Sequence, residues 1–519
     1  MKQYLILLIC LAGMLNSCAD SLDITPEDRQ SITNAFDDDD ELMGFLISIE
    51  GYIQRVIKND SHQAMGAAAD RCDNSGYSNL RDLVPATVTS SFYSDWSPYY
   101  DIIYLCNLML ENVHQAEGNI SQERIDFYIS QAKFCKGWMY FELGRIWGNA
   151  IITTSTNNFE PYANSTDYEV IAEAINNMEE AYEMLGSYGE LTDNNGELLL
   201  SKQYGTKGAA AGLLAHIYAW QGSMAELYNW PGISSSEAYE QSIKWSTKLI
   251  SGEDSGLYNL AIDIPTMLEQ NFSGWEPSTR LMASESILEV QRFYLEDNSV
   301  GYISPIIERY VTWPVDYNDG TSTIEGAAVT FKFEASTIQN MYKGEDERKE
   351  TYFYKVDSMA TAGHQFSYPY KVSNGVFRVV SQTTGITRMT GLDCNNIYIR
   401  LAGIYLLRAE CYAKLGNEAN AITDLNTIRN RAKAELYPAE GDADIQYAIF
   451  KEREKELLME NGRYYDVLRN NYIDTELPPA FALLSDQDIQ DGALYLNIGE
   501  AAFTNNTLLK QNIYWYRVQ

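Results

Sequence analysis

The strongest candidates for acid–base chemistry are two glutamates in a charged segment near the C-terminus. Glu456 and Glu460 are four residues apart, so a helix would place both carboxylates on one face. Paired carboxylates can act as a general acid and a general base. The same segment carries Arg453 and Arg463, and opposite charges at helical spacing usually form ion pairs. We therefore interpret both glutamates as ion-pair partners of these arginines, not as catalytic groups.

Other patterns of catalysis or metal binding are missing from the sequence. It contains no HExxH, no GxSxG and no glycine-rich phosphate loop. The four histidines lie far apart and have no metal-ligand spacing: His62, His114, His216 and His364. The segment from Asp316 to Glu325 resembles a calcium loop, but its spacing is too short, which favours a solvated turn over calcium binding. We expect a protein that is not an enzyme and has no cofactor.

Aromatic residues offer a different chemistry, because an indole or phenol face can stack on the C–H face of a sugar. Trp138, Trp220 and Trp245 have helical apolar spacing and are predicted to be core residues. Other rings lie among glycines, prolines and amides, where loops are exposed. These candidate stacking residues are Trp275, Trp313, Tyr77 and Tyr317, with Trp96 at a loop–helix junction as a weaker candidate.

A shallow ligand site is predicted on two loop segments, Asp70–Tyr77 and 271–319. Loops on a rigid scaffold can present exposed rings at low reorganisation cost, whereas helices use their rings for packing. Asp73 and Asn74 lie beside Tyr77 and could hydrogen-bond sugar hydroxyls. Stacking contacts are individually modest, so we expect micromolar to millimolar affinity, roughly −8 to −4 kcal/mol.

A repeated pattern indicates the helical scaffold that would carry these loops. A small residue, an aromatic residue and a glycine recur at steps of three and four. The three copies are Gly137-Tyr140-Gly144, Ala215-Tyr218-Gly222 and Ala409-Tyr412-Gly416. Apolar stripes at Ala174-Met178-Ala181 and Ala421-Leu425-Ile428 predict partner helices, which is typical of tetratricopeptide-type hairpins. Tyr398 shares the spacing of the third copy and is predicted to open its first helix.

The predicted fold is mainly α, with a loop-rich insertion that contains short β-strands. Scaffold helices are expected over 42–250 and 397–470, within a single domain, and residues 471–519 read as irregular. The helical period fades over 251–396, which is too long for one plain loop and predicts an ordered insertion. Strands are predicted there at Ile287–Tyr294, Tyr352–Val356 and Gly375–Val380.

Several segments, spread over almost the whole chain, occur in the order seen in one protein family. They are SDWSPYYDIIYLCN, QAKFCKGWMYFELGRIWG, FEASTIQNMYKGEDERKETYF, IRLAGIYLLRAE, DLNTIRNRA and LLKQNIYW. Together they resemble the SusD/RagB family of outer-membrane lipoproteins. The sequence departs from the family pattern at Cys135-Lys136-Gly137, where an Arg-Ala pair is usual, and at Ile513, which replaces a proline.

The resemblance implies a function as well as a fold. Proteins of this family capture glycans, or sometimes peptides, on the outer surface beside a SusC-like TonB-dependent transporter. We therefore expect an oligosaccharide-binding protein that delivers its ligand to such a transporter, with peptide capture as the first alternative. A helical-repeat adaptor that binds no small ligand is the second alternative. The net charge of −34 repels phosphate backbones, which excludes nucleic acid as a partner.

The first residues have the layout of a lipoprotein signal peptide. A short basic start precedes an apolar run over 4–15 that is too short to span a bilayer. Leu15-Asn16-Ser17-Cys18 resembles a lipobox. We expect residues 1–17 to be removed and Cys18 to carry palmitate and other acyl chains that anchor residues 18–519 to the outer membrane. The alternative is an ordinary secretory signal with an incidental cysteine.

The remaining cysteines give no metal or disulfide pattern. Cys106, Cys135 and Cys411 fall in apolar helical patterns and are predicted to be buried thiols. Cys72 and Cys394 lie in loop-like sequence, and a bond between them is left open.

Overall fold

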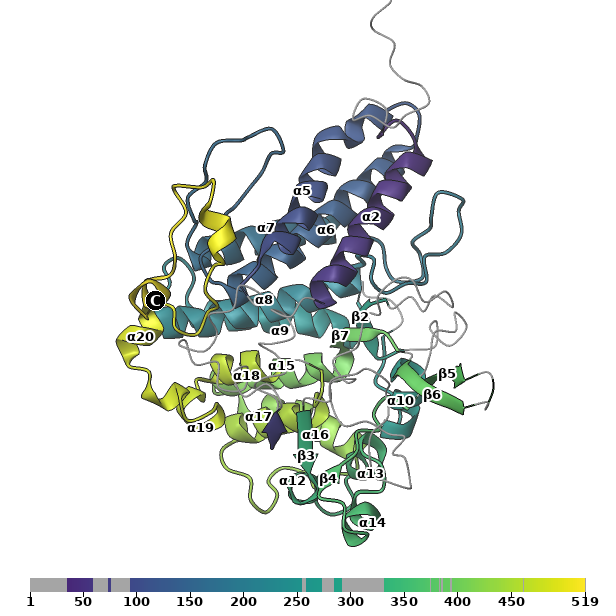
Figure 1. The fold of residues 1–519 in the computed structure, drawn as a ribbon, viewed down its shortest axis with the longest axis vertical. Coiled ribbons are helices and arrows are strands. Elements are labelled where there is room, and N and C mark those ends of the chain that lie inside the picture. Colours follow the sequence, from purple (N-terminus) through teal and green to yellow (C-terminus); the bar gives the residue numbers. More distant parts are fainter. Residues whose placement is uncertain are drawn as a thin grey trace, which may run out of the picture.

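The structure is a computed structural model, and it is mainly helical. It describes residues 35–58, 73–75, 94–253, 258–272, 284–291, 331–373, 375–381, 383, 386–392, 394–460 and 462–518. The N-terminal helices form one layer, α8 and α9 cross the middle of the molecule, and the helices of the C-terminal half lie on the other side (Figure 1). The predicted tetratricopeptide-like fold is confirmed.

The N-terminal half consists of long helices. Their bounds are α2 Asp39–Lys58, α5 Ser97–Asn112, η1 Val113–Ala116, α6 Gln122–Ile146, α7 Asp167–Met184, α8 Lys207–Tyr228 and α9 Ser235–Ser251. Serine or threonine begins several of them. The Ser121 side chain accepts from Arg124 N–H at α6, and Thr206 accepts from Ala209 N–H at α8, which satisfies otherwise unpaired donors of the first turn. Short polar caps therefore set where these helices start.

The C-terminal half mixes short strands with helices. The bounds up to residue 400 are α10 Ile264–Phe272, β2 Ser286–Val290, β3 Phe331–Glu334, α12 Ala335–Met341, α13 Arg348–Tyr352, α14 Val356–Thr361, β4 Phe366–Ser367, β5 Gly375–Ser381, β6 Ile386–Leu392 and β7 Asn396–Arg400. Beyond it they are α15 Leu401–Lys414, α16 Glu418–Arg431, α17 Ile445–Glu456, α18 Arg463–Asn470, α19 Ile473–Glu476, η3 Phe481–Leu483, α20 Asp486–Gln490, η4 Glu500–Phe503 and α21 Ile513–Val518.

The three repeated patterns form helical hairpins, as predicted: α6 packs on α7, α8 on α9, and α15 on α16. The glycines of the pattern have two separate physical roles. A Cβ on Gly222 would lie 2.6 Å from Cε1 of Tyr239, so glycine allows α8 and α9 to approach closely. Gly416 follows α15 with φ +74°, a left-handed conformation that a side chain would disfavour.

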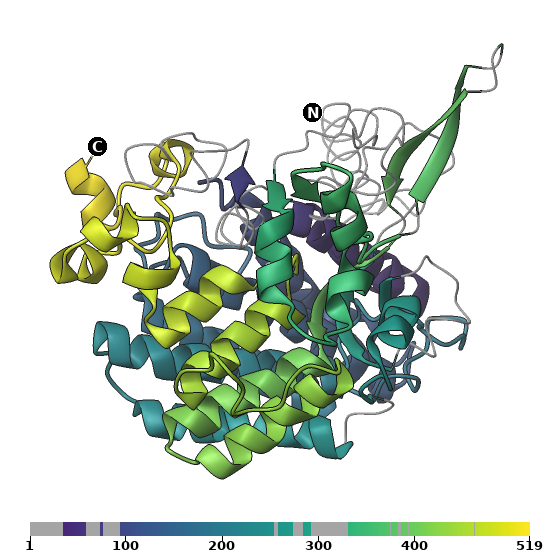
Figure 2. The same cartoon turned by 90° about the horizontal axis from the view of Figure 1, so that it is seen from below.

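Short strands tie distant segments together. β2 and β7 pair antiparallel, with Ser286 opposite Arg400 and Val290 opposite Asn396. β1 (Asn74–Ser75), β3 and β4 form a second sheet, and the β5–β6 hairpin projects from the helical body (Figure 2). The predicted strands near 287 and 375 are therefore confirmed.

Two local predictions of secondary structure are wrong. The segment Tyr352–Val356 is not a strand: α13 ends at Tyr352, α14 begins at Val356, and Phe353 makes a single bridge to Pro369. Tyr398 lies in β7, before α15. The strand β7 is only five residues long and is followed directly by α15. The helical spacing between Tyr398 and the residues of α15 is therefore a coincidence.

The start of α2 carries a run of acidic residues. Asp39, Asp40 and Glu41 occupy the first turn of α2, where negative charge is favourable. Asp39 also pairs with Arg124 Nε at 3.0 Å, which ties α2 to α6.

A buried carboxyl group lies further along the same helix. Glu50 is 6% exposed and accepts hydrogen bonds from Nε2 of Gln203 and from the Cys135 thiol. Burial raises the pKa of Glu50 to about 8, although both hydrogen bonds act in the opposite direction. The folded protein therefore keeps a proton that the unfolded chain releases above about pH 4.5. Its stability falls as the pH rises from 4.5 to 8.

Replacing Glu50 with Gln is expected to stabilise the protein at neutral pH. The amide keeps the size and the acceptor of the protonated acid but has no proton to lose, so the free energy of unfolding should rise by about 3 kcal/mol at pH 7. Urea denaturation at pH 5 and pH 8 measures the effect, which should be larger at pH 8. The matched control is Glu183→Gln, at an exposed carboxylate on α7. Equal effects of the two changes at both pH values would contradict this role of Glu50.

Candidate ligand-binding site

The described part of the first predicted loop pairs with β3, which lies in the wider insertion 251–396 but beyond the predicted segment 271–319. Asn74 pairs with Lys332 and Ser75 with Phe331 in the β1–β3 ladder. The N–H of Asp73 donates to the carbonyl oxygen of Lys332 at 2.9 Å. The predicted loop at 70–77 and the insertion therefore share an edge.

Asp73 has a structural role at this edge. Its Oδ2 accepts from the N–H of Glu334 at 2.7 Å, and its Oδ1 accepts from the hydroxyl of Thr337 at 2.9 Å. Both oxygens therefore hold the corner between β3 and α12. Contact of Asp73 or Asn74 with a sugar hydroxyl stays a prediction.

Trp96 is a core residue, which removes it from the candidate stacking residues. Its side chain is 4% exposed and lies directly before α5. Its ring meets Tyr100 at 5.3 Å and Trp147 at 6.2 Å between ring centroids. No open ring face is left for a sugar. Trp138, Trp220 and Trp245 are buried as predicted.

The other candidate stacking residues lie outside the described residues: Trp275, Trp313, Tyr77 and Tyr317. The same is true of Cys18, of Cys72 and of the calcium-like segment Asp316–Glu325. Cys106, Cys135 and Cys411 are buried, as predicted, and Cys394 is buried as well. Within the described ranges, no group of three His, Cys, Asp or Glu side chains is arranged to hold a metal ion.

Glu456 and Glu460 both form ion pairs, but not with Arg453 and Arg463; Glu456 is buried and Glu460 is nearly so. Glu456 meets Arg400 Nη1 at 2.7 Å, Arg348 Nη1 at 3.0 Å and also Arg431. Glu460 pairs with Arg400 and Lys371. The predicted partners were wrong because the actual partners come from distant segments of the chain. Local helical spacing cannot indicate such contacts.

The arginines on the same helix segment have other partners. Arg453 Nε lies 3.0 Å from Asp466 Oδ2, and Arg463 Nε lies 2.7 Å from Glu454 Oε2. All four of these side chains are buried. The charged segment is therefore an internal polar layer, whereas its composition is typical of an exposed helix.

The electrostatics of this layer argue against a general-acid role for Glu456. Burial favours its neutral form, but the guanidinium groups of Arg431, Arg400 and Arg348 prevail and lower its pKa far below the usual value. Glu460 follows the same pattern, with Arg400 and Lys371 lowering its pKa. A general acid must carry a proton near neutral pH, and neither group does.

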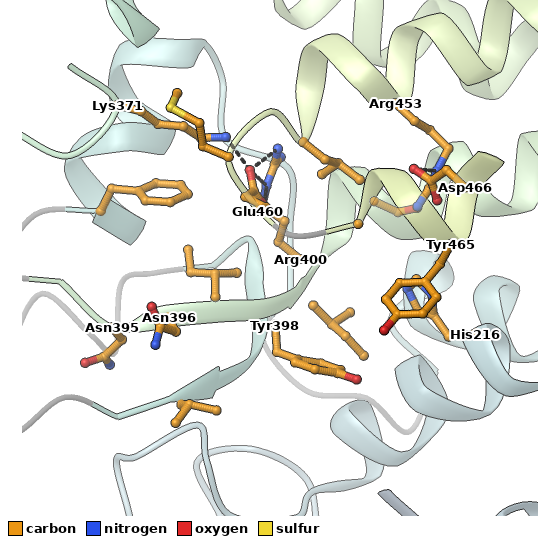
Figure 3. A pocket seen from close by; sticks show the side chains of 18 of the residues that line it. His216, Lys371, Asn395, Asn396, Tyr398, Arg400, Arg453, Glu460, Tyr465 and Asp466 are labelled. Atoms are coloured by element: carbon orange, nitrogen blue, oxygen red, sulfur yellow. Dashed lines mark hydrogen bonds and ion pairs between the residues drawn. The ribbon is translucent and has the colours of Figure 1, made fainter. Parts of the chain in front are cut away.

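An internal pocket of about 120 Å³ lies between the N-terminal and C-terminal halves (Figure 3). Arg145 of α6 and His216 of α8 line it from the N-terminal half, and Tyr398, Tyr465 and Arg469 line it from the C-terminal half. The sequence did not predict this site. The available signal was His216, a lone polar ring in the apolar stretch of α8.

His216 is neutral near pH 7. Burial lowers its pKa well below the usual value, and the guanidinium groups of Arg453, Arg469 and Arg145 lower it further. The pocket therefore contains a neutral imidazole beside three guanidinium groups, and the Glu410 carboxylate only partly opposes their effect on its pKa.

Comparison with known proteins identifies the family. A model of the SusD family matches residues 308–515, and a model described as starch-binding associating with outer membrane, of SusD-like type, matches residues 22–219. The chain belongs to the SusD/RagB family. No helix in the described part of this SusD/RagB chain is long and apolar enough to cross a membrane.

Relatives of known SusD type match along most of the chain. SusD-like protein P38 of Formosa agariphila is 22% identical over 93% of this chain and 94% of its own. A SusD-like protein of Bacteroides ovatus is 23% identical over 90% of this chain and 82% of its own. The shared length confirms that the resemblance extends beyond isolated motifs.

Solved structures share the fold. A SusD homologue from Bacteroides thetaiotaomicron superposes with a TM-score of 0.71 at 19% identity, covering 92% of this chain and 98% of its own. A laminarin-binding SusD-like protein superposes with a TM-score of 0.66 at 18% identity, covering 92% and 99%.

Proposed function

We propose that this protein captures oligosaccharides at the cell surface and passes them to a SusC-like TonB-dependent transporter. The observation that carries the proposal is its membership of the SusD/RagB family over most of its length. The superposition on a laminarin-binding SusD-like protein supports a glycan as the ligand class. Ligand capture needs exposed groups on a rigid scaffold, and the helical hairpins supply that scaffold.

The bound glycan is released unchanged in this proposal. The candidate acid–base pair is ionised and fully engaged by arginine and lysine, so it supports no hydrolysis. Glycoside hydrolysis needs two carboxyl groups that flank the bond, one of them protonated. The residues Glu456 and Glu460 fit a structural role instead.

The proposed ligand site is the loop face around Asp73–Ser75 and the insertion. Pairing of β1 with β3 and the two hydrogen bonds accepted by Asp73 hold this edge in place. Trp275 and Trp313 are the proposed stacking residues, with Tyr77 and Tyr317 as further platforms. Because this edge is already held in place, little backbone ordering is needed when a ligand binds beside it.

Glycan arrays combined with affinity electrophoresis test the ligand class. Retarded migration in a gel that contains one polysaccharide, with normal migration in gels of unrelated polysaccharides, supports glycan capture. Binding to peptide pools without binding to any glycan would favour the peptide-capture alternative. A stable protein partner with neither ligand would favour the adaptor alternative.

Membrane attachment through Cys18 is part of the proposal, and changing Cys18 to Ala should abolish it. Without the thiol no lipid can be added, and acyl chains provide most of the membrane affinity of an anchored protein. The mutant should appear in the soluble fraction, whereas the wild type stays with outer membranes. Mass spectrometry of the wild-type N-terminus should find acyl chains. Membrane retention of the mutant together with an unlipidated wild type would contradict the anchor.

A further inference from the structure

The carboxylates that line the internal pocket are already engaged. Asp466 receives a hydrogen bond from Arg469 and an ion pair from Arg453 at 3.0 Å. Glu460 receives hydrogen bonds from Arg400 and Lys371. A cation that entered the pocket would have to compete with these bonded guanidinium and ammonium groups.

Guanidinium donors at the same pocket are only partly used. Arg145 donates through Nε and Nη2 to Glu142 and through Nη2 to the Tyr398 hydroxyl. Arg469 donates through Nε and Nη2 to Glu410 and through Nη2 to Asp466. In the part of the chain that the structure describes, the Nη1 group of each arginine has no hydrogen-bond acceptor. Each therefore keeps donors for a further acceptor.

Two more polar groups at this end have no partner among the described residues. The hydroxyl of Tyr465 is buried without a hydrogen bond, and its side chain is 3% exposed. His216 has no hydrogen bond from either ring nitrogen to a described residue. Figure 3 shows Tyr465 in front of His216, with the Tyr398 ring drawn below and to the left of them. The Tyr465 hydroxyl is buried, whereas His216 is half-buried. A buried polar group without a partner is rare and usually marks a bound water or ligand.

We propose that this end of the pocket binds one compact oxyanion, a phosphate or a carboxylate group, between Arg145, His216, Tyr465 and Arg469. The surplus of donors over free acceptors selects for a ligand whose oxygens accept hydrogen bonds. The whole pocket, of which this site is one end, has a volume of about 120 Å³, well above the roughly 10–15 Å³ that one water needs on the same measure. The anion would join α6 and α8 to α18, and so the two halves of the scaffold. This site is separate from the proposed glycan site.

Thermal unfolding of the purified protein in sodium phosphate or sodium acetate tests the site, with sodium chloride used to hold the ionic strength constant. A ligand that binds the folded state raises Tm with its concentration, by about 1 °C per tenfold increase above Kd for a chain of this size. A response to phosphate alone indicates an inorganic oxyanion, and a response to acetate as well indicates any carboxylate. No saturable rise with either salt would overturn the proposal.

Removing a single hydroxyl group distinguishes anion binding at this site from a general effect of salt on stability. Tyr465→Phe removes the unpaired hydroxyl and breaks no hydrogen bond within the described structure, so the variant should fold. Its Kd for the anion should rise about tenfold, because one of the proposed contacts is lost. The control is Tyr104→Phe, at an exposed tyrosine of α5 that does not line the pocket. Equal salt responses in both variants and the wild type would contradict the assignment.

Crystals soaked in sodium selenate provide a direct test, because selenium gives an anomalous signal at a tetrahedral oxyanion. We expect a peak within hydrogen-bond distance of Tyr465 Oη and Arg469 Nη1. A pocket filled by water alone, at selenate concentrations that saturate the thermal response, would overturn the proposal.

Discussion

Replacing Glu456 with Ala is expected to lower the free energy of unfolding by about 3–5 kcal/mol, the usual cost of removing one partner from a buried ion pair. Its carboxylate lies between Arg348, Arg400 and Arg431, and all four side chains are buried. Removing it takes away the one carboxylate that all three buried guanidinium groups share. This is the largest loss of stability that we expect from one substitution in the chain.

The effect should extend across the molecule, because the network joins separate segments. Glu285 before β2 binds Arg400 Nη1 at 2.9 Å and Arg431 Nη1 at 2.8 Å, and Arg348 begins α13 in the insertion. Glu456 therefore holds the insertion against α16 and α17. Loss of this centre should weaken the base from which the ligand loops extend.

Urea denaturation followed by circular dichroism measures the loss, with Glu440→Ala as the control at an exposed carboxylate. Glu456→Gln provides a second test, since it removes the charge but keeps the size. The folded pKa of Glu456 is far below its usual value of 4.5, so its contribution is present above pH 4.5 and decreases as the pH falls below it. Glu456→Gln should reduce that acid sensitivity. A change below about 1 kcal/mol in both variants, the range of an exposed ion pair, would contradict the role assigned to this network.

Replacing Trp275 and Trp313 together with Ala is expected to abolish measurable glycan binding. The loss of two stacking rings at about 0.5–1.5 kcal/mol each raises Kd about 5- to 150-fold, which moves a Kd that starts near millimolar beyond a practical titration. Isothermal titration with the glycan identified on arrays gives the affinity. Helical circular dichroism and Tm should stay close to those of the wild type.

The control is Phe159→Ala, at a ring that is 92% exposed on the loop between α6 and α7. It removes an exposed aromatic side chain away from the proposed loop face, and binding should be unchanged. If the double variant unfolds, both tryptophans are core residues. If it folds and binds with wild-type affinity, the ligand site lies elsewhere on the protein.

The parts of the fold that depend on local spacing could be predicted from the sequence. The spacing of Ala409, Tyr412 and Gly416 depends only on one helix and the turn that ends it. The structure has that helix, α15, followed by its hairpin partner α16. Burial of Trp138 and Trp220 follows from the same periodicity. Helical repeats are predictable because each unit contacts mainly its neighbours.

Long-range polar contacts could not be predicted in this way. Arg400 meets Glu456 from 56 positions away, and Asp73 accepts from the N–H of Glu334 from 261 positions away. Charged residues at helical spacing are usually exposed, so burial of the segment around Glu456 contradicts the local expectation. The burial of Trp96 could not be predicted for the same reason, because its ring packs against Trp147 at the C-terminal end of α6.

The most direct test of glycan capture without catalysis combines binding with recovery of the ligand. The soluble protein, without its signal peptide, is titrated with the array-identified oligosaccharide, and the oligosaccharide is then recovered after long incubation and sized by chromatography. We predict saturable binding in the micromolar to millimolar range, with the oligosaccharide recovered at its original length. Shorter products, or no binding to any glycan on the array, would contradict the proposal.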